Sequence, residues 1–192
     1  MHEYLDNLLL WTQENDMKIN ISKTKELPMG PWGRFDIAPL QTISGIIERV
    51  SEVKLLGVYI DPSLSWNKHI NYIAGKAGKR LYFLKILKRS GVPRDHRLHY
   101  YIAVIRSVLE YCSCIWHHNI PQSLSIHTES IQKRALRRIS LNCRRDTSYA
   151  KLLADTGIFS LQQRRNIQAK ILFSVNPPAR LVSRLFVTRT TR

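Results

Sequence analysis

Hydrophobic positions change their spacing at about residue 65. Val53 to Ile60 is a short apolar run with β-branched residues, closed by Asp61-Pro62, and it predicts a strand that ends in a turn. From Trp66 onward, apolar residues recur at spacings of three and four, as on one face of a helix. Ser65 is a candidate N-cap and Gly91 a candidate C-cap. One strand is therefore expected to lead into one long helix with an apolar side and a basic side.

A second helical pattern follows Pro93 and is expected to end before Pro121. Its apolar residues alternate at spacings of four and three, which is the seam of one unbroken helix. The seam residues are Leu98, Ile102, Ile105, Leu109, Cys112 and Trp116.

The chain beyond Pro121 predicts three shorter helices, over residues 123–141, 147–154 and 160–175. In the first of them, Ile131, Ala135 and Ile139 are spaced to lie inside. Ser160 is the candidate cap of the last, in which Ile167, Ile171 and Val175 lie on one face and which Pro177-Pro178 stops. We expect Trp66, Leu81, Leu84, Ile105, Leu109 and Trp116 to be buried where the two long helices pack.

Shorter and mixed patterns occupy the N-terminal third. Glu3 to Gln13 predicts a helix whose leucines at positions 5, 8 and 9 face a core, with Trp11 as a further candidate. Residues 17–29 begin with the polar–apolar alternation of a strand. Residues 30–33 predict a turn, and the segment 35–47 is broken by proline and glycine, which indicates a loop and an edge hairpin.

Together these patterns predict an α+β fold: a short helix plus a small antiparallel sheet at the N-terminus, followed by a mainly α-helical bundle. The expected domains are 1–64 and 65–176. The 192 residues, 44% of them hydrophobic, suffice for one sizeable core or a small domain with a helical extension. Residues 177–192 contain four arginines and no acid, so they are expected to form a basic disordered tail.

Positive charge is the strongest global signal, and it is regional. The chain has 30 Lys and Arg against 14 Asp and Glu, a formal net charge of +16. Residues 1–64 are net negative, with 6 basic and 9 acidic side chains, whereas residues 65–110 hold 10 and 2, and residues 133–192 hold 14 and 2. A basic second half points to a polyanionic partner, most often RNA or DNA. A solvated surface or an unpaired oligomer face is the alternative.

Cysteine use and hydropathy bear on the compartment. Cys112, Cys114 and Cys143 make no disulfide framework, which fits a reducing, intracellular location and leaves nucleus and cytoplasm open. No apolar run is long enough to cross a membrane, and the acidic N-terminus lacks the charge pattern of a signal peptide.

The sequence contains few residue patterns that could support metal binding or catalysis. Cys112, Cys114, His117 and His118 resemble a zinc motif, but on one helix the two cysteines point about 200° apart, so we expect no metal and small core cysteines instead. No acids are paired as two-metal polymerase chemistry requires, and no glycine-rich cofactor loop follows a strand. No catalytic residues and no cofactors are expected.

Several segments in order resemble the C-terminal part of reverse transcriptases of LINE-type (non-LTR) retrotransposons. These segments are L-L-G-V-Y-I-D, then L-S-W-N-K-H-I, a lysine-bearing helix, and L-E-Y-C-S-C-I-W. The resemblance covers about residues 8–173. It implies a remnant of the polymerase palm over 1–64, a thumb or connection region over 65–176, and catalytic aspartates in a region that would precede this chain. The chain alone is then a fragment, not expected to be an enzyme, that binds a primer–template backbone.

Two site residues come from the resemblance in the N-terminal part. Lys23, in N-I-S-K-T-K, corresponds to a lysine on the phosphate side of the polymerase site or a general acid; an exposed edge-strand lysine is the alternative. Gly57 corresponds to the hairpin that supports the primer end, where glycine would allow a close backbone approach; a bulge in a buried strand is the alternative.

The remaining candidate nucleic-acid contacts come from two basic helical zones, expected on either side of the seam helix. They are Lys68, Lys79, Lys85 and Arg89 in one zone, and Lys133, Arg134, Arg137 and Arg138 in the other. Tyr72 and Tyr82 lie near them and could stack on an unpaired base, although core packing is favoured for both.

Two other functions remain open. Residues 68–105 also resemble a small segment at the N-terminus of AlkB-homologue alkylation-repair proteins, which implies an association with tRNA methylation and 2-oxoglutarate dioxygenase chemistry, although no residues here carry that chemistry. The other alternative is a structural helical module whose apolar face needs a partner domain, such as the palm and fingers of a longer polymerase.

Overall fold

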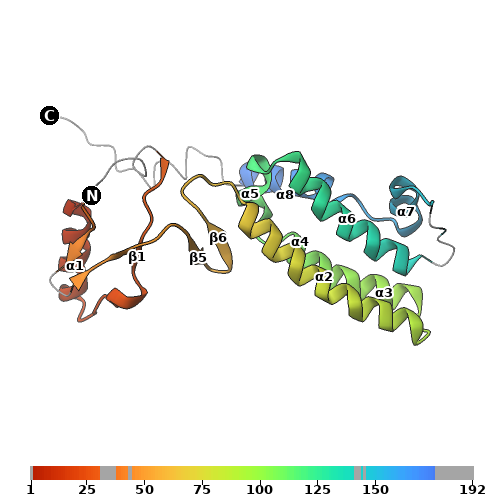
Figure 1. Ribbon diagram of the computed structural model, residues 1–192, viewed down its shortest axis with the longest axis horizontal. Helices are drawn as coiled ribbons and strands as arrows, with labels where there is room; N and C mark the ends of the chain where they lie inside the picture. Colours follow the sequence, from red (N-terminus) through yellow and green to blue (C-terminus); the bar gives the residue numbers. More distant parts are fainter. Residues whose placement is uncertain (1, 31–37, 43–44, 141–143, 145, 176–192) are drawn as a thin grey trace. The chain divides into compact units, whose positions relative to one another are not determined.

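The structure of the chain is a computed structural model that describes residues 2–30, 38–42, 45–140, 144 and 146–175 (Figure 1). It divides into two units, Met1–Trp66 and Asn67–Arg192. This division falls two residues after the boundary expected at residue 64. The tail expected over 177–192, Cys143 and most of the turn expected at 30–33 lie outside the described residues.

The N-terminal unit combines one helix with short strands. Helix α1 (His2–Glu14) is followed, among the residues described, by three two-stranded ladders. β1 (Lys25–Glu26) pairs in parallel with β4 (Glu48–Arg49), while β2 (Gln41–Thr42) pairs antiparallel with β3 (Gly45–Ile46) and β5 (Val53–Leu55) antiparallel with β6 (Val58–Ile60). The predicted α+β class, a small strand-bearing part followed by a mainly helical one, is confirmed, with one parallel pair besides the antiparallel ones.

The strand expected from the alternation at residues 17–22 is wrong. Ile21–Lys23 form a 3-10 turn, η1. Asn20 caps this turn: its Oδ1 accepts from the Lys23 backbone N–H at 3.2 Å and from the Ser22 hydroxyl at 2.7 Å. Short polar side chains of this kind satisfy the local backbone themselves and so compete with strand pairing.

The single strand expected over residues 53–60 is a hairpin instead. Leu56 and Gly57 form its two-residue turn with φ of +47° and +87°, and β5 and β6 pair on either side. Positive φ at both turn positions matches the twist of the flanking strands. The expected bulge at Gly57 is therefore wrong, because this glycine serves the turn.

Helix α2 (Asn67–Arg89) begins and ends at identifiable signals. Ser65, the expected N-cap, instead donates its hydroxyl to Asp61 Oδ2 at 2.7 Å, and Trp66 with φ of +60° stands before the first helical residue. At the other end Gly91 has φ of +72°, its N–H reaches the carbonyl of Lys88 at 3.3 Å, and the next N–H reaches that of Leu87 at 3.1 Å. This is a Schellman motif, so the predicted glycine cap is confirmed.

The seam helix expected between residues 93 and 121 is not continuous. It consists of α3 (Arg94–Tyr100), a π-helical segment η3 (Tyr101–Arg106) and α4 (Ser107–Leu109). Cys112, with φ of +51°, then breaks it before α5 (Ser113–Trp116) and the 3-10 turn η4 (His117–Asn119).

Burial from residue 97 to residue 113 follows a spacing of four rather than the alternating four and three. The buried residues of that stretch are Arg97, Tyr101, Ile105, Leu109 and Ser113, and Trp116 follows three residues later. In an ideal α-helix a spacing of four drifts by about 40° per step. The wider π segment offsets this drift and keeps the same side toward the core.

The described part of the second unit continues with α6 (Gln122–Ile139), α7 (Tyr149–Thr156) and α8 (Leu161–Val175). Ile131, Ala135 and Ile139 of α6 are buried, as predicted. Ser160 accepts from the Gln163 backbone N–H at 3.2 Å, and Gln163 Oε1 accepts from the Ser160 N–H at 3.1 Å. This reciprocal pair is a capping box, so Ser160 is confirmed as the cap of α8.

The core of the second unit lies where α2, the π segment, α4, α6 and α7 meet. The six side chains expected to be buried are buried: Trp66, Leu81, Leu84, Ile105, Leu109 and Trp116. However, α2 and α6 pack directly against each other, as their neighbouring ribbons in Figure 1 show. The expectation that the seam helix separates the two basic helices is therefore wrong.

Candidate nucleic-acid interface

The packed pair α2 and α6 gathers most of the basic residues singled out in the sequence. Helix α2 carries seven Lys and Arg and no Asp or Glu. Five of the candidate side chains on the two helices are exposed: Lys68, Lys79, Lys85, Arg89 and Arg134. Lys133, Arg137 and Arg138 are half-buried. The structure thus brings together on one helix pair eight of the ten candidates, from segments about 50 residues apart.

Some of these cations have internal partners. Arg138 Nη1 donates to the carbonyl of Leu81 in α2, and burial, together with the nearby Arg134 charge, lowers the pKa of Arg138. Lys88, which was not singled out, reaches the carbonyls of Arg137 and Ser140, each at 3.4 Å. Arg138 therefore ties α6 to α2, and a phosphate would compete with that bond.

The two candidates in the N-terminal unit lie on different local structures. Lys23 is exposed at the end of the 3-10 turn, not on an edge strand, so that alternative is wrong. Gly57 lies in the β5–β6 turn beside the exposed Leu56. No cluster of three His, Cys, Asp or Glu suited to a metal ion occurs among the described residues.

Two exposed aromatic residues on α2 were not recognised as a pair from the sequence. Tyr82 is 61% exposed and Phe83 56% exposed, and their rings meet edge to face with centroids 6.0 Å apart. The core packing favoured for Tyr82 is therefore wrong. Both residues fall outside the buried stripe of Ala77, Leu81 and Leu84, which is the signal that could have revealed them. Tyr72 is half-buried, with Lys76 Nζ 5.2 Å from its ring centroid.

The cysteine–histidine motif has no metal-binding geometry among the described residues. The angular argument from one continuous helix does not hold, because the chain breaks at Cys112. Cys112 and Cys114 are half-buried rather than core residues. His117 Nδ1 lies 3.4 Å from Arg165 Nε, and its Nε2 is hydrogen-bonded to Asn166. Burial lowers the pKa of His117 against the effect of the Asn166 bond.

A buried arginine at the start of α8 is a further feature that the sequence did not reveal. Arg165 is fully buried, its guanidinium lies 5.5 Å from the Trp116 ring, and Nη2 donates to Ser125 Oγ at 2.9 Å. Next to it, Arg164 forms a bidentate pair with Glu110 at 2.6 and 3.1 Å. These contacts hold α8 to α5 and α6, so both arginines have structural partners and not a free surface.

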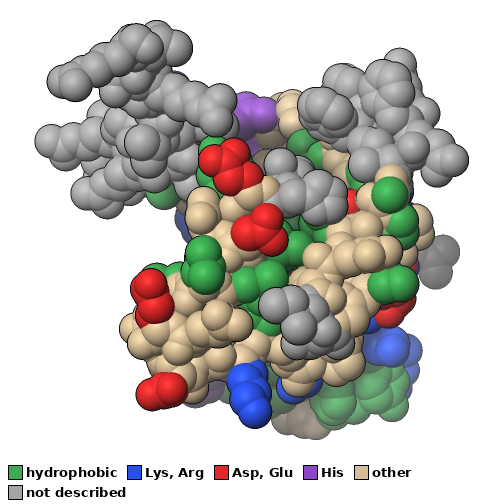
Figure 2. Space-filling model, turned by 90° about the vertical axis from the view of Figure 1, so that its left-hand side faces the viewer, with side chains coloured by type: hydrophobic (Ala, Val, Ile, Leu, Met, Phe, Trp, Pro, Cys, Tyr) green, Lys and Arg blue, Asp and Glu red, His purple; other side chains and the backbone are tan. Residues whose placement is uncertain are grey.

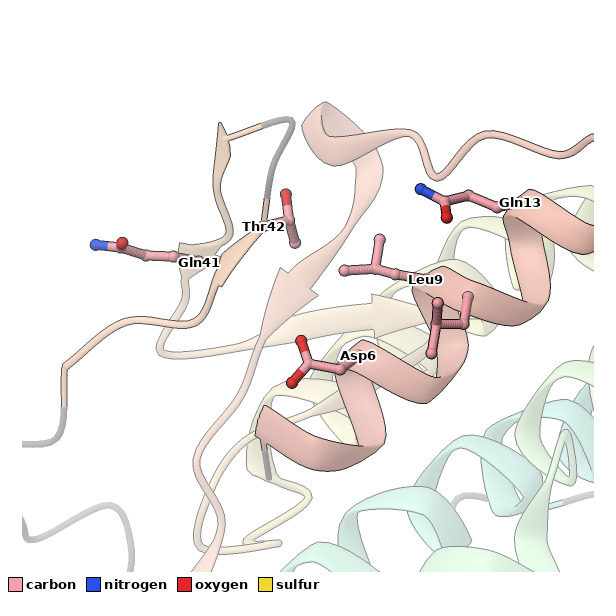
Figure 3. Close-up of a pocket in the computed structure, with 6 residues that line it drawn as sticks. Asp6, Leu9, Gln13, Gln41 and Thr42 are labelled. Carbon is pink, nitrogen blue, oxygen red and sulfur yellow. The ribbon is translucent and has the colours of Figure 1, made fainter.

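A pocket of about 480 Å³ lies within the N-terminal unit, between α1 and β2. It is lined by Asp6, Leu9, Leu10, Gln13, Gln41 and Thr42. In Figure 3, Asp6 and Leu9 extend from α1 on the side of Thr42, while Gln41 points away from the helix. One carboxylate among amides and leucines gives this pocket no catalytic pair.

The surface of the N-terminal unit is apolar and acidic, whereas that of α2 and α6 is basic. Figure 2 shows hydrophobic side chains open to solvent between carboxylates on this face. The large exposed apolar residues of α1 are Tyr4, Leu8, Leu10 and Trp11, so the expectation that Leu8 faces a core is wrong, and so is the candidate position of Trp11 in that core. Among the described residues no helix is both long enough and apolar enough to cross a bilayer.

Comparisons with protein-family models, with curated proteins and with solved structures found no match to this chain.

Proposed function

We propose that the helical unit binds the phosphate backbone of RNA or DNA, without reading sequence, through the basic surface of α2 and α6. The observation that carries the proposal is the exposure of Lys79, Lys85, Arg89 and Arg134 on two helices that pack together. Phosphates repeat along a nucleic acid, so spread cations can track a backbone without base contacts. The resemblance to the thumb region of LINE-type reverse transcriptases points to the same ligand, a primer–template.

The absence of counter-charges on α2 supports this function. The helix carries no Asp or Glu, so its exposed lysines have no i,i+4 acidic partners that would neutralise them. Like charges close together on one helix repel one another and are stabilised when a polyanion binds. Displacement of counterions from the polyanion then adds a favourable entropy that decreases as salt increases.

The test is the salt dependence of binding to a duplex, measured by fluorescence anisotropy. Neutralisation of four to six phosphates predicts a slope of log affinity against log salt of about −4 to −5 on B-form DNA. The variant Lys79→Ala/Lys85→Ala/Arg89→Ala/Arg134→Ala should weaken binding to all sequences alike and flatten the slope by about three units.

A control with cations removed from other helices separates this surface from general basicity. Lys151→Ala/Lys170→Ala removes two exposed cations from α7 and α8 and should leave the slope nearly unchanged. Deletion of residues 179–192 is a second control, because an arginine-rich segment alone can bind polyanions. Binding that is insensitive to salt, or equal in the fourfold variant and the wild type, would refute the proposal.

A second candidate function is a structural module that docks on a partner domain. The observation in its favour is a group of exposed apolar residues in the second half of α8: Ile167, Ile171, Leu172 and Phe173. The buried residues of the same helix are Leu161, Arg165 and Ala169. This function predicts a chain that aggregates alone and becomes soluble when a palm and fingers fragment is co-expressed.

A further inference from the structure

The exposed aromatic pair on α2 has a setting that the backbone-binding function does not explain. Two neighbouring aromatic rings more than half exposed leave apolar area in water that burial would stabilise by about 25 cal/mol per Å². A patch of this kind with a polar rim marks an interaction site. The residues around the patch then determine which kind of ligand can bind.

The rim of the Tyr82 ring is positively charged. Lys79 stands three residues before Tyr82, Lys85 three after and Arg89 seven after, which places all three on neighbouring turns of the same side of α2. All three are exposed, and the helix contains no acid. A ligand for this patch therefore needs a flat apolar face with negative charge on both sides. A nucleotide has that chemistry, because its base lies between two phosphates along the strand.

Open space beside the ring fits a flat ligand. Side chains of a helix lean toward its N-terminus, over the residue four positions earlier. For Tyr82 that residue is Gly78, and a Cβ placed there would meet no atom within 4 Å. The same is true of Gly75, one turn earlier. The surface of α2 is therefore open at both glycines, which leaves room for a flat ligand beside Tyr82.

We propose that Tyr82 and Phe83 form a stacking platform for unpaired bases, flanked by Lys79, Lys85 and Arg89 that hold the adjoining phosphates. The proposal rests on the proposed function and narrows its ligand to nucleic acid with a single-stranded segment. Aromatic side chains stack on any base, so this platform needs no sequence preference.

Two single strands of about 12 nucleotides test the platform, a length within the range that such sites cover. One is an oligothymidine and the other has the same backbone without bases. Fluorescence anisotropy compares their affinities for the full chain. The oligothymidine should bind at least fivefold tighter than the abasic strand.

Leucine substitutions identify the residues responsible. Tyr82→Leu/Phe83→Leu keeps helix-forming apolar side chains but removes the rings, and should abolish the preference for bases while leaving the salt slope unchanged. Gly78→Leu should do the same by filling the open space, although leucine is the better helix former. Phe159→Leu is the matched control, because Phe159 is also exposed but lies outside α2. Circular dichroism confirms that each variant is folded.

The outcomes separate this inference from the proposed function. Equal affinity for the two strands, or an unchanged preference in the double leucine variant, would overturn the platform while salt-sensitive binding still supported the backbone function. The aromatic pair would then belong to a surface that an apolar protein partner covers, which leucines would serve equally well. A chain that binds neither strand nor duplex would overturn both proposals.

Discussion

Arg97 in α3 donates a hydrogen bond from Nη1 to the backbone carbonyl of Arg138 in the last turn of α6. Arg97 is only 3% exposed, and Lys88 from α2 reaches the neighbouring carbonyls from the solvent side. The last carbonyls of a helix have no intrahelical donor and carry the negative end of the helix dipole. Two cations from two other helices therefore close the end of α6 and join the three helices of the bundle.

Replacement of Arg97 by methionine tests this closure. Arg97→Met keeps most of the side-chain volume but removes the donor, and should lower the free energy of unfolding by about 2–3 kcal/mol. Lys88→Met removes an exposed cation at the same helix end and should cost less than about 1 kcal/mol. Urea denaturation followed by circular dichroism measures both. Equal losses of unfolding free energy in the two variants would mean that burial does not strengthen the hydrogen bond of Arg97.

Leu109 tests the packing of the interrupted seam helix. Its side chain is fully buried in the core cluster between α2 and α6 residues. Leu109→Ala should destabilise the chain by about 2–5 kcal/mol, because the lost contacts leave a cavity. Ile115→Ala, at an exposed position of α5, is the control and should change stability by about 0.5 kcal/mol or less. A loss below about 0.5 kcal/mol for Leu109 would contradict packing along this side.

The same substitution at two glycines should act in opposite directions. Gly75 lies inside α2 with open space around it, so Gly75→Ala should raise the free energy of unfolding by about 0.5–1 kcal/mol through the better helix propensity of alanine. Gly91 has φ of +72° in the Schellman motif, so Gly91→Ala should lower it by about 1–2 kcal/mol. Thermal and urea unfolding measure both signs. Stabilisation by Gly91→Ala would show that the cap conformation is not kept.

His69 should make stability depend on pH. It is fully buried in α2, with its ring centroid 6.1 Å from that of Trp116, and burial lowers its pKa. The unfolded chain then binds a proton more readily than the folded one. The contribution of neutral His69 is complete above about pH 6.5 and decreases as the pH falls below that value.

The measurement is urea unfolding at about pH 7.5 and at about pH 5.5. The wild type should lose more stability between these values than His69→Gln, which cannot take up the proton. His118→Gln, at an exposed position of the 3-10 turn η4, is the control and should behave as the wild type. Identical pH profiles for the wild type and His69→Gln would exclude His69 as the titrating group.

The resemblance to the C-terminal part of reverse transcriptases predicts that this chain has no polymerase activity. Two-metal phosphoryl transfer needs paired carboxylates that hold both ions, and no two acidic residues are adjacent in the sequence. The purified chain should extend no primer on an RNA or DNA template with Mg²⁺ or Mn²⁺. Template-directed incorporation that persists through repeated purification would refute this expectation and with it the fragment interpretation.

Local signals explain the features that the sequence predicted correctly. The capping box of Ser160 and the Schellman motif of Gly91 each depend on hydrogen bonds within about five residues. The apolar spacing of α6 likewise predicted which side of that helix is buried. The apolar spacing of α2 likewise predicted its exposed cations, because they lie away from the buried apolar side of that helix.

Only the tertiary structure decided the features that depend on distant residues. The run 53–60 folds back as a hairpin although its turn has leucine at a positive φ, a choice that sequence propensity disfavours. Burial at a spacing of four along residues 97–113 depends on a π segment, which packs against α2. Arg97 caps the end of α6, whereas Arg134 is exposed. The difference depends on which backbone carbonyls another helix brings within reach of each arginine. The period of a sequence determines the side of a helix that seeks burial, but the partners that cover it come from long-range packing.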